Sequence, residues 1–246
     1  MNDISKIMSQ RLITLSEMLR DESGNKLRVA DVGCDHGYVS IYLIQKDIAR
    51  SAIAMDVRRG PLSGAEANIR AYGLEAGITT RLSDGIKELN KGEADTLVIA
   101  GMGGKLMMSI LEGKDLKELG IKTALLQPQS DIPMLRQYIR DKGYSILDER
   151  IIFEEGKYYF PMKISTQGGE GKDIDLSNPQ LLRVCNRYGE CNIMRRDPLL
   201  LDYLSHGREV CETILSNLND EGHRARRKEV EEELFDISFT LKYMEE

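Results

Sequence analysis

The strongest constraint on the fold is a short apolar segment that runs directly into a glycine-rich turn. Residues 27–32, Leu-Arg-Val-Ala-Asp-Val, are typical of a buried strand, and Gly33-Cys34-Asp35-His36-Gly37 follows them. Apolar residues then recur at helical spacing from Tyr38 onward. A strand, a glycine turn and a helix in this order build a small-molecule site at the carboxyl end of a strand in an α/β sheet. We therefore expect a ligand at this turn.

The charges of the turn favour a cationic ligand over a phosphate. A dinucleotide-binding turn has the pattern Gly-x-Gly-x-x-Gly, but Asp35 and Tyr38 stand at its second and third glycine positions. Asp31 and Asp35 would repel a pyrophosphate, because like charges at short range repel one another. S-adenosylmethionine carries an ammonium and a sulfonium group. These groups suit an acid at the strand end and glycines that permit close approach of the backbone.

Acidic residues also follow the next two predicted strands. Asp56 ends residues 51–56, about 20 residues after Gly37, near the spacing at which this architecture binds ribose hydroxyls. Asp84 follows residues 78–82, where its carboxylate can accept a hydrogen bond from an adenine amino group. A single acid would mean little, because turns commonly contain Asp and Gly. Three acids at three successive strand ends favour S-adenosylmethionine as the cofactor.

The pattern of residues 1–165 predicts an α/β fold with a Rossmann-like, doubly wound, mostly parallel seven-stranded sheet. We expect an amphipathic helix over 4–19, before the first strand. The later strands are expected at 94–100 and 123–127, followed by 145–153 and 158–165 as an antiparallel hairpin through Glu155-Gly156. Helices are expected at 38–48, 60–72, 85–89, 105–111 and 131–142.

The remainder of the chain predicts a separate helical domain. Residues 166–177 are glycine-rich and polar, as expected of a linker, and residues 178–246 have a helical pattern. One long helix begins at Pro198, and Gly222 separates it from a second, which predicts a coiled-coil-like α-helical hairpin. The basic run Arg224-Ala225-Arg226-Arg227-Lys228 can bind RNA phosphates. Alternatively, it forms ion pairs with the glutamates that follow it along the helix.

Composition excludes several classes of protein. The formal charge of −6 argues against a protein coated in nucleic acid, although it leaves room for an RNA enzyme with local basic patches. The four cysteines and three histidines show no metal-ligand spacing, so we expect no metal. We find no membrane-spanning run, and the charged residues within 1–19 are not typical of a signal peptide. The cytoplasm is therefore the expected location.

Three motifs together resemble one family. They are Ala30-Asp31-Val32-Gly33-Cys34-Asp35-His36-Gly37-Tyr38, Ile99-Ala100-Gly101-Met102-Gly103-Gly104 and Leu126-Gln127-Pro128-Gln129. In this order they resemble the bacterial tRNA adenine-22 N1-methyltransferase family, with small departures at Cys34 and Gly37, where the family often has Ser and Ala. The resemblance covers the chain to about residue 165 and extends to the helical tail. It implies S-adenosylmethionine as methyl donor and an adenine in the D-arm region of tRNA as substrate.

The site residues follow from the motifs and the resemblance. Asp35 corresponds to the family's suspected catalytic residue, and we expect it to stabilise the positive charge that develops on the methylated base or to take a proton. Cofactor contacts are predicted at Asp31, Gly33, His36, Gly37, Asp56, Val57, Asp84, Gly85, Ala100 and Gly101. Substrate contacts are predicted at Met102, Gly103, Gly104, Gln127, Pro128, Arg58, Arg59, Arg224, Arg226, Arg227 and Lys228.

Two other functions remain open on the sequence alone. A methyltransferase for a small molecule needs no basic surface, and the acidic net charge suits it. A protein that binds the cofactor without catalysis would act through its helical hairpin as a partner module. We expect tRNA rather than a membrane as the partner and favour a monomer.

Overall fold

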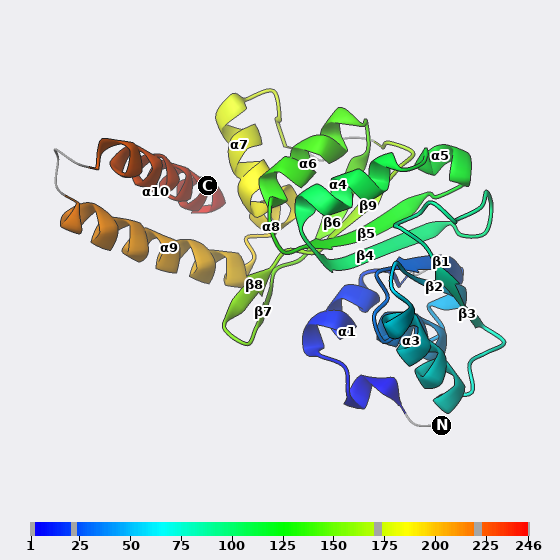
Figure 1. The fold of residues 1–246 in the computed structure, drawn as a ribbon. Coiled ribbons are helices and arrows are strands. Elements are labelled where there is room, and N and C mark those ends of the chain that lie inside the picture. The colour runs from blue at the N-terminus through cyan, green and yellow to red at the C-terminus, as the bar shows by residue number, and fades with distance from the viewer. Residues whose placement is uncertain (1–2, 21–23, 170–173, 219–222, 246) are drawn as a thin grey trace. The chain divides into compact units, whose positions relative to one another are not determined.

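The computed structural model describes residues 3–20, 24–169, 174–218 and 223–245 (Figure 1). The chain divides into two compact units, Met1–Gly171 and Lys172–Glu246, which are described separately below. The linker expected over 166–177 stays a prediction, and residues 170–173 of it lie outside the described residues. None of the described helices combines the length and the apolar character needed to cross a membrane.

The first unit is built on a seven-stranded sheet with the order β3-β2-β1-β4-β5-β9-β6, which confirms the predicted fold class. The first five strands are parallel, and β9 runs antiparallel to both of its neighbours. The strands are β1 (Leu27–Val32), β2 (Ala49–Asp56), β3 (Ile78–Leu82), β4 (Thr96–Met102), β5 (Thr123–Pro128), β6 (Ser145–Glu149) and β9 (Met162–Ser165).

Helices cover both faces of this sheet because its central strands are apolar on both sides. In β4, Leu97, Val98 and Ile99 are all fully buried. Figure 1 shows α4 and α6 together on one face, and α1 and α3 on the other. The helices of this unit are α1 (Gln10–Glu17), α2 (Tyr38–Gln45), α3 (Arg59–Ala71), α4 (Gly104–Glu112), α5 (Leu116–Leu119) and α6 (Ile132–Asp141).

The N-terminal helix differs from its prediction. The single helix expected over 4–19 is divided into a short 3₁₀ helix, η1 (Ile4–Lys6), and α1. Ser9 causes the division, because its backbone is extended and its hydroxyl caps α1 by accepting the N–H of Leu12 at 3.3 Å. The helix expected over 85–89 is also absent, and these residues form a turn in which the hydroxyl of Ser83 accepts the N–H of Glu88.

The predicted C-terminal hairpin of the sheet is divided as well. Segments 145–153 and 158–165 each form two strands, and the outer parts pair as a separate sheet of β7 (Ile152–Glu154) and β8 (Lys157–Tyr159). Pro161 stands between β8 and β9 and has no N–H to continue a strand ladder. As a result, the β7–β8 hairpin leaves the main sheet.

The second unit is helical, as predicted. It contains α7 (Pro179–Tyr188), α8 (Glu190–Met194), α9 (Pro198–Asn217) and α10 (Arg224–Glu245), and the predicted break at Gly222 lies outside the described residues. α9 and α10 pack along each other. Asp236 of α10 is fully buried and forms ion pairs with Arg183 and Arg187 of α7. This pairing fixes α7 against the hairpin.

Candidate functional site

The carboxyl ends of β1, β2 and β4 border a cavity of about 360 Å³. Parallel strands end at the same edge of a sheet, so residues far apart in the chain meet there. Most of the predicted cofactor residues line this cavity, namely Asp31, Gly33, His36, Asp56, Ala100 and Gly101. Asp35, Met102 and Arg58 line it too.

The turn after β1 requires glycine at two positions. Gly33 has φ +73°, and a Cβ built there would lie 2.0 Å from Cε of Met102, which lines the cavity. Gly37 has φ +72°, and its Cβ would lie 3.2 Å from Cβ of Ala65. Side chains at these positions would strain the backbone and crowd the cavity or the α3 helix. The turn therefore keeps the end of β1 open to a ligand.

Asp31 is a buried carboxylate at the end of β1. It is 4% exposed, and its Oδ2 accepts a hydrogen bond from Oγ of Ser40 at 2.8 Å. Burial raises the pKa of Asp31 to about 6, and the nearby charge of Asp56 adds to the increase. In the part of the chain that is described, Asp31 forms no ion pair. A carboxylate of this kind suits the ammonium group of a ligand.

Asp56 takes the matching position at the end of β2. It is 5% exposed, and its Oδ1 accepts the backbone N–H of Arg58 at 2.8 Å. Nε of Arg58 lies 3.9 Å from the same oxygen, on a side chain that is 75% exposed. The carboxylate is thus held in one orientation at the cavity wall, as an acceptor for hydroxyl groups would be.

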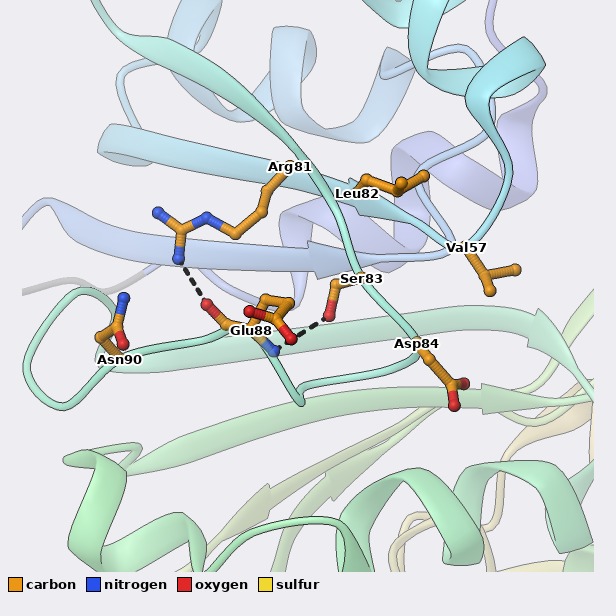
Figure 2. A pocket seen from close by; sticks show the side chains of 7 residues that line it. All are labelled: Val57, Arg81, Leu82, Ser83, Asp84, Glu88 and Asn90. Carbon is orange, nitrogen blue, oxygen red and sulfur yellow. Dashed lines mark hydrogen bonds between the residues drawn. The ribbon is translucent and has the colours of Figure 1, made fainter.

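A second, more open depression lies at the ends of β2 and β3 (Figure 2). Figure 2 shows Val57 and Leu82 beside the loop that carries Ser83 and Asp84. Val57 is 61% exposed and Leu82 is 43% exposed, so both present apolar surface to this depression. Apolar surface next to the Asp84 carboxylate can hold a flat heterocycle that bears an amino group. Gly85, the next predicted contact, packs instead against Ile110 of α4.

Asp35 and His36 form the rim of the first cavity. Asp35 has φ +50°, a conformation that is uncommon outside glycine, and its side chain is 68% exposed. Nε2 of His36 lies 3.7 Å from Oδ2 of Asp35, and the His36 ring stacks on Tyr38 with 5.5 Å between centroids. The turn therefore presents a second carboxylate that is open to a substrate.

The predicted substrate residues divide into two groups. Met102 and Arg58 line the cavity, whereas the Gly103 and Gly104 positions are filled by packing against Ser130. A Cβ on Gly104 would lie 2.6 Å from the backbone oxygen of Ser130. These two glycines therefore let α4 start close to the loop after β5. Pro128 ends β5 and is buried, and Arg59 begins α3 with an exposed side chain; neither lines the cavity.

Arg11 lines the cavity although it is not among the predicted site residues. It lies on α1, where the helical pattern places it on the polar side. In the folded unit its Nη1 donates to Oε1 of Gln127 at 2.6 Å, and Gln127 is fully buried. Arg11 thus stands between the predicted substrate residue Gln127 and the cavity. No local motif signals this arrangement, because it depends on contact between segments over a hundred positions apart.

The predicted RNA-binding run lies at the start of α10, in the other unit. Its side chains pair with the following glutamates: Arg226 with Glu229 at 3.0 Å, Arg227 with Glu231 at 3.8 Å and Lys228 with Glu232 at 3.9 Å. All three pairs lie on the helix surface, and such pairs contribute little to stability. The run, including Arg224, stays a prediction for RNA contact.

The fold and the cavity define a class of protein. A Rossmann-like sheet with buried acids at the ends of β1 and β2, beside a positive-φ glycine turn, is the arrangement of a methyltransferase that takes its methyl group from S-adenosylmethionine. The chain belongs to the methyltransferase domain family, whose profile matches residues 8–162. No group of three or more His, Cys, Asp or Glu side chains within the described ranges is placed to hold a metal ion.

Comparison with known proteins confirms the resemblance inferred from the motifs. The chain is 38% identical over 160 residues to a tRNA (adenine(22)-N(1))-methyltransferase of Bacillus subtilis; the match covers 65% of this chain and 64% of that relative. The crystal structure of a candidate tRNA (m1A22) methyltransferase of Streptococcus pneumoniae superimposes with a TM-score of 0.82 at 27% identity, covering 96% of this chain and 100% of that one. A complex of that protein with S-adenosyl-L-methionine gives a TM-score of 0.78, at the same identity and coverage.

Proposed function

We propose that the protein transfers a methyl group from S-adenosylmethionine to N1 of adenine 22 in tRNA. The observation that carries the proposal is the cavity at the ends of β1 and β2, where the buried carboxylates of Asp31 and Asp56 face a positive-φ glycine turn. The similarity to tRNA (adenine(22)-N(1))-methyltransferases supports the substrate. The cytoplasm and a monomeric state remain the expected setting.

The residues present fit the donor. The buried Asp31, which forms no ion pair among the described residues, would receive its ammonium group, and Asp56 would accept hydrogen bonds from its ribose hydroxyls. Val57 and Asp84 would hold the adenine, through apolar contact and through a hydrogen bond from its amino group. When bound, the donor supplies a methyl group activated by the positive charge on its sulfur.

The acceptor nitrogen needs no deprotonation before it reacts, because N1 of adenine has a lone pair of its own. Its lone pair forms the bond to the methyl carbon while the bond from that carbon to sulfur breaks, and the electron pair of that bond goes to sulfur. The base becomes cationic and then loses a proton from its amino group. Positioning supplies most of the rate enhancement for such a displacement.

Asp35 is the proposed catalytic residue, because its carboxylate is exposed at the cavity rim and is not needed to bind the donor. It would stabilise the charge on the base or accept the proton. Asp35→Asn keeps the shape and removes the charge, so we expect kcat to fall by about 100-fold or more at saturating donor and tRNA. Unchanged turnover at saturation would remove Asp35 from the mechanism.

N1 lies on the Watson–Crick edge, so the adenine must leave its stack to reach the cavity. The helical unit is the proposed holder of the tRNA body, through phosphate contacts of its basic run. Replacing Arg224, Arg226 and Lys228 by Gln together should weaken tRNA binding and flatten its dependence on salt, with donor binding unchanged. Lys242→Gln, on the same helix but outside the run, is the matched control.

The direct test is incubation of unmodified tRNA with the protein and donor labelled in its methyl group, followed by mapping of the labelled nucleotide. We expect label at N1 of adenine 22, and none in a tRNA that carries guanine there. Label at another position would refute the substrate, and absence of label in any RNA would refute the activity. Methyl transfer to a small molecule instead would favour the alternative suggested by the acidic net charge of −6.

A further inference from the structure

Arg11 occupies a wall of the donor cavity that none of the roles above uses. Its side chain is 18% exposed, and its guanidinium lies over the ring of Tyr159, 4.9 Å from the centroid. Its backbone N–H donates to Oε1 of Glu154 at 3.0 Å, and its Nε lies 3.6 Å from Oε2 of the same residue. The fork of the side chain is therefore held in place from two directions.

One terminal nitrogen of this fork remains available. Nη1 is engaged by Gln127, and Nε is buried beside Glu154 without a hydrogen bond. Nη2 has no hydrogen-bond partner among the residues that the structure describes. Holding Arg11 between a buried amide and a carboxylate costs conformational entropy. It also fixes the direction in which the N–H groups of Nη2 can donate to a ligand.

The charges around the cavity are distributed unevenly. Arg58 lies beside Asp56 at the end of β2, whereas Arg11 contacts the end of β5 through Gln127. The sheet order β2-β1-β4-β5 places Asp31 of β1 between these two arginines. The methionine half of the donor carries an ammonium, which Asp31 suits, and an α-carboxylate, which needs a cation. Arg11 lies on the side of Asp31 away from the proposed ribose site.

We propose that Arg11 binds the α-carboxylate of the methionine half of S-adenosylmethionine. This inference rests on the proposed donor. Arg11 and Asp31 would then bind the two opposite charges of the amino-acid group, and the available Nη2 of Arg11 would donate a charge-assisted hydrogen bond to the carboxylate. Gln127 and Glu154 are positioning residues, because they act on the donor only through the orientation of Arg11.

Calorimetry with three adenosine ligands tests the assignment without turnover. S-adenosylhomocysteine has the complete amino-acid group, decarboxylated S-adenosylmethionine lacks the carboxylate, and 5′-methylthioadenosine lacks the whole group. For Arg11→Ala we expect S-adenosylhomocysteine to bind about 10- to 100-fold more weakly, which corresponds to the loss of one charge-assisted hydrogen bond. The other two ligands should bind within about twofold of the original protein. Arg20→Ala is the control, because Arg20 forms an ion pair with Glu17 outside the cavity.

The results separate the possible failures. If Arg11→Ala weakens the binding of all three ligands equally, the residue only shapes the site. If the affinity for S-adenosylhomocysteine is unchanged but tRNA methylation is slower, Arg11 contacts the RNA. Either result overturns the inference. If Arg11→Ala does not fold, Arg11→Lys serves instead, because it keeps the positive charge without the planar guanidinium. It should weaken the binding of S-adenosylhomocysteine in part and leave the binding of the other two ligands unchanged. No binding of S-adenosylhomocysteine to the unaltered protein would refute the proposed donor itself.

Discussion

Replacing Asp31 by asparagine should stabilise the ligand-free protein at alkaline pH while it weakens donor binding. Asp31 is buried with a hydroxyl as its side-chain hydrogen-bond partner, and burial raises its pKa to about 6 from an ordinary value of 3.8. The folded protein therefore binds this proton more tightly than the unfolded chain between about pH 4 and pH 6. Raising the pH through that window ionises the buried group and lowers the free energy of unfolding.

The pKa shift sets the size of the effect. A difference of about two units corresponds to about 3 kcal/mol at pH 8, and this falls to about 1 kcal/mol at pH 4.5. Asparagine keeps an oxygen that can accept the hydrogen bond from Ser40, but it carries no charge. The Asp31→Asn protein should therefore be more stable than the original by up to these amounts.

Urea unfolding of both proteins at pH 8 and pH 4.5, without ligand, measures the difference directly. The gain from Asp31→Asn should be larger at pH 8. A variant that is less stable at pH 8, or one whose gain is the same at both pH values, would show that Asp31 carries no buried, unpaired charge. We also expect Asp31→Asn to weaken the binding of S-adenosylhomocysteine, as measured by calorimetry at pH 8. If the stability result contradicts the prediction, that weaker binding would have no electrostatic explanation.

Three more outcomes follow from the structure. Affinity for S-adenosylhomocysteine should fall about tenfold between pH 8 and pH 5 as Asp31 is protonated, and calorimetry on Asp31→Asn should show no such dependence. Gly143→Ala, at φ +68° in open space, should lower the free energy of unfolding measured in urea by about 1 kcal/mol. Gly37→Ala should lower it more, because the added Cβ also meets Ala65 of α3. Equal losses would contradict this. Glu149→Ala should lower the free energy of unfolding by about 3–5 kcal/mol, because it removes the carboxylate that lies 2.7 Å from the fully buried Arg136 guanidinium. A loss below about 1 kcal/mol would be inconsistent with a buried ion pair.

Local sequence predicted the strands well where an apolar run has sharp polar ends. The structure places β1 and β3 at the predicted residues, and Gly33 and Ser83 stand directly after these two strands. The prediction failed where one hydroxyl or one proline overrides the periodicity. Ser9 divides the first helix, and Pro161 separates β8 from β9.

The acids at the strand ends were predictable because the topology of a parallel sheet brings consecutive strand ends to one edge. Asp31 and Asp56 both line the cavity, and Asp84 lies in the adjoining depression. Arg11 was not predictable, because its role depends on Gln127 and Glu154, which lie 116 and 143 positions away. Helical periodicity reports only that such a residue is on the polar side of its helix.

The central claim is that the cavity at the end of β1 binds a cationic methyl donor and not a phosphate-linked dinucleotide. Parallel calorimetric titrations with S-adenosylhomocysteine and with NAD test it most directly. We expect saturable binding of S-adenosylhomocysteine at one site per chain and no heat of binding from NAD. Tight binding of NAD, with none of S-adenosylhomocysteine, would contradict the assignment of the cavity and everything inferred from it.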